Sequence, residues 1–264
     1  MARINWLRDE LILAFNLYCK TPFGRIHIRN PEIIALAKLL GRTPSAVSWK
    51  LANFARLDPS LRARQIKGAS HGASADIEVW EEFNSDWSRL AFESEKLLAK
   101  LTGRRIEETI EETFDEAPRA GKERESIVKV RVNQSFFRQS VLAAYDVKCC
   151  ITGLAIPQLL CASHIVPWAV DIANRVNPRN GLCLNPIHDR AFDRGLITIN
   201  SEYKVVVSRS IKLTPGDSAA KAFILDFAGR SIRLPKRFRP DPVLLKYHNE
   251  RIFRDTSGKE AEPR

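Results

Sequence analysis

Apolar residues recur at helical spacing through the first part of the chain. Residues 6–18 form one such stretch, and Asn30 and Thr43 each stand directly before a proline, a combination typical of a helix start. Gly41 lies between the two helices predicted from these signals and is expected to end the first of them. Two helices joined by a short glycine-containing turn predict a helix-turn-helix arrangement.

The third predicted helix, residues 45–57, has an apolar face and a polar one. Val47, Leu51 and Phe54 share the apolar face, so the hydroxyl, amide and basic side chains point elsewhere. Residues 42–67 contain six basic side chains and one acid, the asymmetry expected of a surface that faces phosphates. An alternative is a helical hairpin with a solvated basic face. We expect DNA contacts from Arg42, Ser45, Ser48, Lys50, Asn53 and Arg56.

A helix-turn-helix-like, all-α domain is expected to span residues 1–104. Residues 76–101 have the pattern of one longer amphipathic helix, which would close this domain. Residues 106–116 contain six acids and no base, a composition typical of an exposed linker. We place the linker at 105–126 and a second domain at 127–264.

The second domain is predicted to mix short strands with helices. Residues 126–132 alternate like a strand, 134–145 favour a helix, and 149–153 and 161–170 are short β-rich stretches. A turn then precedes a short helix within 183–193, followed by strands within 195–199 and 203–208 and a last helix within 243–253. The chain as a whole is therefore predicted to be α+β.

The stretch 149–199 carries the most specific pattern. It contains ITG at 151–153, HI.PW at 164–168 and NGL.L at 180–184, and we assign a final H..FD.GL segment to His188 and the residues after it. This order resembles the HNH nuclease family. The resemblance implies a ββα-metal (HNH) nuclease domain in which a strand supplies His164, a loop supplies Asn180 and a helix supplies His188.

The chemistry that the resemblance implies suits phosphodiester hydrolysis. A neutral imidazole is a suitable base at neutral pH, so His164 would take a proton from water. Asn180 would hold its loop and orient that imidazole. A cation bound by His188, Mg²⁺ or Mn²⁺, would stabilise charge on the phosphate and on the leaving oxygen.

One position departs from the family pattern. Many HNH enzymes carry an Asp or a His directly before the base as a second metal ligand, whereas this chain has Ser163. Asp193 lies five residues past His188, and we expect it to be a ligand or a neighbour of one, whereas Asp189 would face differently. A helix-capping or salt-bridge role is the alternative for Asp193.

The charge composition indicates what kind of molecule the protein binds. The 42 Lys and Arg residues outweigh 31 Asp and Glu, giving a formal charge of +11 and an isoelectric point near 9.6. This balance favours a polyanion, and with the predicted helix-turn-helix we expect double-stranded DNA. No signal peptide or membrane span is evident, and a reducing cytoplasm fits the cysteines.

Other residues of chemically active type are expected to be structural. The cysteines form no CxxC pair, so Cys150, Cys161 and Cys183 are expected to be buried thiols rather than zinc ligands. Trp168 is expected to pack in the core, and His27, His71 and His248 to be surface or hydrogen-bonded histidines.

These observations favour a metal-dependent DNA endonuclease, with a bacterial restriction or defence enzyme as the expected setting. Two alternatives stay open: a DNA-binding regulator with a degenerate HNH scaffold, and a nuclease directed at RNA. A homodimer is also compatible with the sequence.

Overall fold

Two units make up the part of the chain that the computed structural model describes, residues 5–62, 74–108, 122–211 and 217–255. The first, the helical unit, runs to Asp146 and also takes in residues 176–178 and 236–238. The second, the mixed unit, comprises residues 147–175 and 179–235 and the chain from Arg239 onward. No described helix is both long and apolar enough to cross a membrane.

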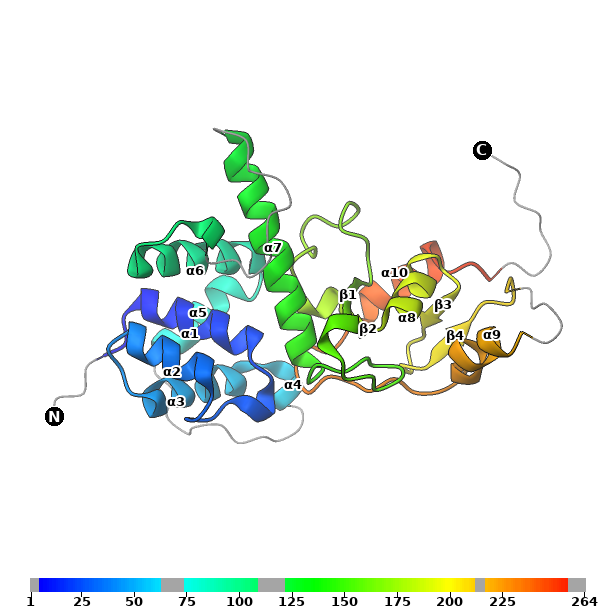
Figure 1. Cartoon of the computed structure of the whole chain (residues 1–264), viewed down its shortest axis with the longest axis horizontal. Helices are drawn as coiled ribbons and strands as arrows, with labels where there is room; N and C mark the ends of the chain where they lie inside the picture. The colour runs from blue at the N-terminus through cyan, green and yellow to red at the C-terminus, as the bar shows by residue number, and fades with distance from the viewer. Residues whose placement is uncertain (1–4, 63–73, 109–121, 212–216, 256–264) are drawn as a thin grey trace. The chain divides into compact units, whose positions relative to one another are not determined.

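The helical unit is built around α1, which packs against α2, α3, α5, α6 and α7 (Figure 1). Phe15 lies at its centre, with its ring stacked on that of Phe54 at a centroid distance of 4.8 Å and tilted against that of Trp80 at 5.0 Å. Burial of these large rings supplies the main stabilisation of the unit. Its α-helices are α1 (Arg8–Lys20), α2 (Pro31–Leu39), α3 (Pro44–Leu57), α4 (Pro59–Arg62), α5 (Ser74–Phe83), α6 (Trp87–Thr102) and α7 (Lys122–Ala144).

The predicted helix starts at Asn30 and Thr43 are confirmed. The Asn30 side chain accepts hydrogen bonds from the backbone N–H groups of Glu32 and Ile33, and the Thr43 hydroxyl accepts one from Ala46. Between the helices, Gly41 adopts φ 63°, a left-handed conformation that glycine reaches without strain. Local capping chemistry therefore fixes the turn between α2 and α3.

Three predicted elements were wrong, and one of them, the β-rich stretch expected at 149–153, is a turn in which the Gly153 N–H donates to the Cys149 carbonyl. The single helix expected at 76–101 is interrupted after Phe83, and Asp86 caps a new helix, α6, by accepting from the Arg89 N–H. The strand expected at 126–132 is part of α7, because Val128, Val132 and Phe136 recur every fourth residue and are all buried. Alternating valines resembled a strand, but the apolar period that packs against α1 and α6 is helical.

A segment from late in the chain completes the helical unit. The buried Arg237 guanidinium donates hydrogen bonds to the backbone carbonyls of Tyr18, Cys19 (2.9 Å) and Thr21, at the end of α1, and lies 4.5 Å from the Tyr18 ring centroid. Backbone carbonyls at a helix end have no partner in the next turn of the helix, and Arg237 provides donors for them. With α7 and residues 236–238 in the helical unit, the division falls after Asp146 rather than in the stretch 105–126, of which 109–121 lie outside the described residues.

The mixed unit begins with two antiparallel strands and a helix. Strand β1 (Cys161–His164) pairs with β2 (Gly181–Leu184) in a register that sets His164 opposite Gly181, and α8 (Pro186–Asp193) packs on both strands. Strands β3 (Ile197–Ile199) and β4 (Val205–Val207) form a second antiparallel pair. The helices α9 (Ser218–Phe223) and α10 (Pro242–Arg251) follow.

His248 fastens α10 to this unit. Its ring stacks 3.6 Å from that of Phe192, its Nε2 donates to the Phe192 carbonyl, and its Nδ1 accepts a hydrogen bond of 2.8 Å from the Thr198 hydroxyl. Burial lowers the pKa of His248 to about 4, so the ring is neutral at pH 7. His248 is thus a hydrogen-bonded core histidine, as predicted. His27 is exposed, and His71 lies outside the described residues.

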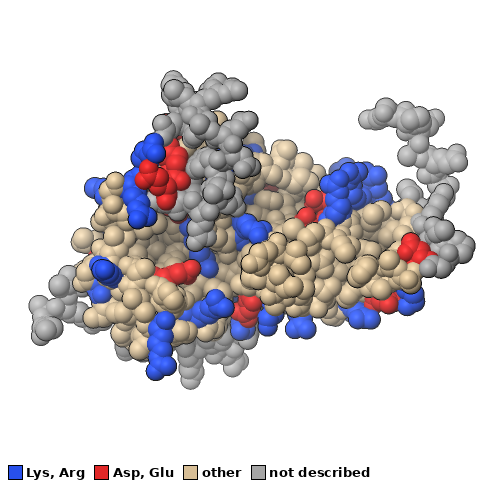
Figure 2. Space-filling view, viewed as in Figure 1, with Lys and Arg blue, Asp and Glu red and all other residues tan. Residues whose placement is uncertain are grey.

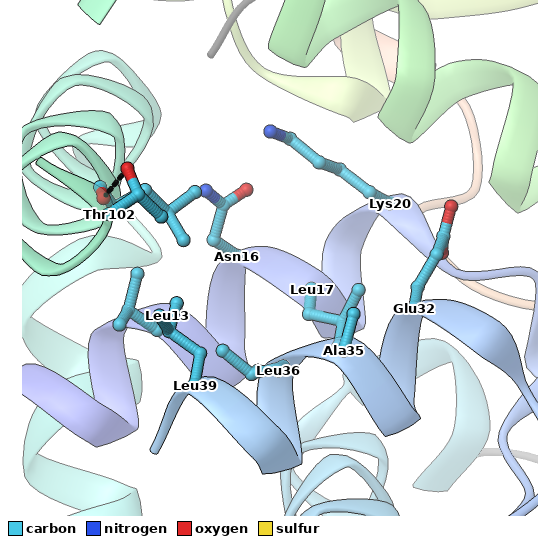
Figure 3. A pocket seen from close by; sticks show the side chains of 10 residues that line it. Leu13, Asn16, Leu17, Lys20, Glu32, Ala35, Leu36, Leu39 and Thr102 are labelled. Carbon is cyan, nitrogen blue, oxygen red and sulfur yellow. Dashed lines mark hydrogen bonds between the residues drawn. The ribbon is translucent and has the colours of Figure 1, made fainter. Parts of the chain in front are cut away.

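The helical unit contains an apolar cavity of about 380 Å³ between α1, α2 and α6 (Figure 3). None of the residues for which the sequence predicted a function lines it. It is lined by Leu13, Asn16, Leu17, Lys20, Glu32, Ala35, Leu36, Leu39, Leu98 and Thr102.

Candidate active site

His164 lies at the end of β1, and a backbone carbonyl fixes its ring. Its Nε2 is 2.9 Å from the carbonyl oxygen of Arg175. A carbonyl only accepts, so Nε2 carries the ring proton and Nδ1 is the nitrogen that accepts a proton. Trp168, expected in the core, is only half-buried, and its ring stands perpendicular to His164 at 5.6 Å.

Electrostatics keep the His164 ring neutral. Burial lowers the pKa of His164, while the Arg175 carbonyl and the negative charge of Asp189 partly offset that effect. Because the resulting pKa lies below its ordinary value of 6.5, the ring is unprotonated at pH 7. His164 therefore has the protonation state that a general base needs.

Asn180 closes the loop that follows His164. Its side chain is fully buried, accepts a hydrogen bond of 2.8 Å from the Val166 N–H, and donates to the carbonyls of Val166 and Asn174 at 3.1 Å each. Arg175 is the next residue along the chain, so the same contacts set the carbonyl that holds His164. This is the loop-holding geometry expected from the sequence.

His188 faces the interior of the mixed unit. It is 2% exposed, its ring stands perpendicular to Phe227 at 5.0 Å, and its Nδ1 accepts a hydrogen bond of 3.0 Å from the Asn185 amide. Its Nε2 is buried and has no hydrogen-bond partner among the described residues. Burial disfavours the thiolate of Cys149, but hydrogen bonds with His188 and Thr152 outweigh it and lower the Cys149 pKa to about 7.

Asp189, rather than His188, is the side chain of α8 whose charge acts on His164. Partial burial and the negative charge of Asp189 also raise the pKa of Asp193, one helical turn further on. Asp189 and Asp193 therefore share a face of α8, whereas His188 and Asp193 lie roughly 140° apart around the helix.

The sequence contained a signal for this correction. The pattern H..FD has two residues between the histidine and the phenylalanine, but three separate His188 from Phe192. The residue at the pattern's spacing is Asp189. Because His188 stands directly before Asp189, it was assigned to the histidine of the pattern although it is one position too early. Only the direction in which α8 buries its apolar face distinguishes the two side chains.

Ser163 and the cysteines contribute no evident metal ligands. Ser163 is 3% exposed, and because neighbouring residues of a strand point to opposite faces, its hydroxyl is directed away from the side of β1 that carries the His164 ring. Cys150 and Cys183 are buried and Cys161 is half-buried. Among the described residues, no three His, Cys, Asp or Glu side chains are grouped closely enough to hold a metal ion by themselves.

Three of the six residues expected to contact DNA instead bind acidic side chains of the helical unit. Arg42 binds Glu10 through two hydrogen bonds of 2.8 and 2.6 Å. Lys50 is buried and lies 2.6 Å from Asp76, which also accepts a hydrogen bond of 2.8 Å from Asn53. The expectation that Lys50 faces solvent was wrong, because Asp76 draws it inward. Ser45 is exposed, and Ser48 and Arg56 are half-buried.

Residues 149–200 match the sequence profile of a family described as HNH endonuclease. The matched stretch includes β1, β2 and α8 and all the residues that surround His164. A comparison with curated proteins found no match to the chain.

Asn180→Ala is expected to lower the free energy of unfolding by about 3 kcal/mol, because it leaves three buried backbone groups without partners. It should also release the Arg175 carbonyl and admit water, so that the pKa of His164 rises towards its ordinary value. Thermal unfolding and an NMR titration of the His164 ring measure the two effects.

Asn200→Ala is the matched control, because the Asn200 side chain accepts hydrogen bonds from the Glu202 and Lys204 N–H groups in the turn between β3 and β4. It should lower stability without moving the His164 titration. A His164 pKa that stays unchanged in Asn180→Ala would show that Asn180 does not position the base.

Proposed function

Residues 149–200 are an HNH endonuclease domain, and from that premise we propose that the protein is a divalent-metal-dependent DNA endonuclease whose general base is His164. The observation that carries the proposal is the hydrogen bond from Nε2 of His164 to the Arg175 carbonyl. It leaves Nδ1 as the proton acceptor, on a ring that is neutral at pH 7. Nδ1 would take a proton from the water that attacks the phosphorus.

HNH nucleases generally use a divalent metal ion, and the donor set on α8 suits one. Asp189 and Asp193 are two carboxylates one helical turn apart, and desolvation together with the negative charge of Asp189 raises the pKa of Asp193. Oxygen ligands of this kind suit Mg²⁺ or Mn²⁺, which usually keep water and substrate oxygens in their shells. A bound cation would neutralise charge on the phosphate and on the leaving oxygen.

The roles of the other residues follow from their contacts. Asn180 holds the loop that presents the Arg175 carbonyl, and Trp168 packs against the base and limits its rotation. His188 would stabilise the interior of the unit through Asn185 and Cys149 rather than bind metal. The proposed site therefore uses His164, Asp189 and Asp193, with Asn180 as a positioning residue.

The helical unit supports DNA as the substrate. Its α2 and α3 have the short-turn spacing of a helix-turn-helix, and the chain carries a formal charge of +11. Figure 2 shows Lys and Arg side chains spread over the visible face, with fewer acidic side chains among them. A cutting domain joined to a reading unit suits a restriction or defence enzyme, which digestion of methylated and unmethylated DNA would test. None of the five cysteines forms a disulfide, as fits the cytoplasm.

His164→Ala is expected to reduce DNA cleavage by about 10²- to 10⁴-fold while leaving DNA affinity nearly unchanged, because it removes proton transfer but few phosphate contacts. Cleavage of labelled duplex and filter binding measure the two quantities. His27→Ala, which alters an exposed histidine of the helical unit, should leave both unchanged. Cleavage by His164→Ala within a few-fold of wild type would remove His164 from the mechanism.

Asp189→Asn should change the Mn²⁺ requirement, whereas His188→Gln should change thermal stability. Asp189→Asn is expected to weaken Mn²⁺ binding and to raise the Mn²⁺ concentration needed for cleavage by at least about tenfold, with little change in thermal stability. His188→Gln should lower thermal stability but keep the wild-type Mn²⁺ requirement, because its ring is buried away from the cation. Electron paramagnetic resonance of Mn²⁺ measures binding independently of activity. The reverse pattern would restore His188 as the metal ligand.

A further inference from the structure

The outward face of α3 is fixed by contacts on its inward side. Lys50 and Asn53 both bind Asp76 of α5, and Val47, Leu51 and Phe54 are fully buried. These contacts determine the rotation of α3 about its axis. The stripe that remains outside recurs at the helical spacing i, i+4, i+7 and i+11 and consists of Ser45, Trp49, Ala52 and Arg56.

Trp49 is the dominant side chain of this stripe. It is 62% exposed, and its neighbours on the same face, Ser45, Ser48 and Ala52, are small. Small neighbours let a partner approach the indole and the helix backbone closely. The serine hydroxyls add hydrogen-bond donors without blocking that approach. The face therefore offers one large aromatic side chain surrounded by small side chains, two of which carry hydroxyl groups.

The charges along this segment favour an anionic partner. Between Thr43 and Arg62 the only acid is Asp58, which is fully buried. Arg56, at the end of the stripe, is half-buried and its Nε and Nη2 atoms are buried, whereas Arg62, on α4, is exposed and donates a hydrogen bond of 3.0 Å to the Arg56 carbonyl. Among residues 43–62, the exposed charge is therefore the basic Arg62 and no acid is exposed, which complements phosphate rather than an average protein surface.

We propose that the outward face of α3, with Trp49 as its anchor, is the surface through which the helical unit contacts duplex DNA. This inference rests on the proposed nuclease function and replaces the contacts expected from Arg42, Lys50 and Asn53. An α-helix fits the major groove, where the indole would pack on thymine methyl groups or on deoxyribose. The Ser45 and Ser48 hydroxyls would contact base edges or phosphates, and the exposed Arg62 would contact a phosphate.

The test uses the full chain in EDTA, so that binding is measured without cleavage, with a fluorescently labelled duplex. Trp49→Ala should weaken binding about tenfold without changing its salt dependence, because the indole carries no charge. Arg62→Gln should instead shallow the slope of log affinity against log salt by about one unit, because it removes an exposed charge. Val130→Ala, an exposed apolar change on α7, is the matched control and should alter neither.

The outcomes separate this inference from the nuclease proposal. If wild type binds duplex and Trp49→Ala binds equally well, the α3 surface is wrong and the nuclease assignment stands. If Trp49→Ala instead changes only the oligomeric state seen by sedimentation, the face is a protein contact and the inference is overturned. If wild type neither binds nor, with Mn²⁺, cuts duplex DNA, both proposals fail. Thermal unfolding of Trp49→Ala should match wild type, because the side chain is exposed.

Discussion

The amide of Asn180 forms the contact on which the rest of the site depends. By pairing with both backbone groups of Val166 and with the Asn174 carbonyl, it closes the loop between β1 and β2 from the inside. The carbonyl of Arg175 is thereby held against His164, which selects the tautomer with its proton on Nε2. One buried side chain thus sets the loop, the ring orientation and the nitrogen that accepts a proton.

The second constraint is the rotation of α8. Asn185 caps the helix by accepting from the His188 N–H and also holds the His188 ring, while Phe192 packs under His248. These inward contacts leave Asp189 and Asp193 on another face, where the charge of Asp189 reaches His164. In the proposed site, His188 would therefore stabilise the core, whereas Asp189 and Asp193 would hold the cation.

The elements that local chemistry determines could be predicted from the sequence. The capping residues of α2 and α3 and the short helix after Asn185 depend on neighbours within a few residues, and these were placed correctly, as was the strand that carries His164, whereas β2 was not predicted as a strand. The predictions that failed depend on partners distant in sequence. Lys50 turns inward because it binds Asp76, which is 26 residues away in the sequence. The valines of α7 are helical because α1 and α6 cover them. His188 and Asp189 are adjacent, and only packing decides which of them faces His164.

The central claim is that this arrangement hydrolyses DNA with a divalent cation, and nicking of supercoiled plasmid by the purified full chain tests it most directly. With Mg²⁺ or Mn²⁺ present, the protein should convert supercoiled plasmid to open-circular or linear product, and EDTA should abolish the conversion. Undiminished cleavage in EDTA would contradict the metal-dependent mechanism. An intact plasmid after incubation of folded protein with either cation would contradict the assignment of nuclease activity.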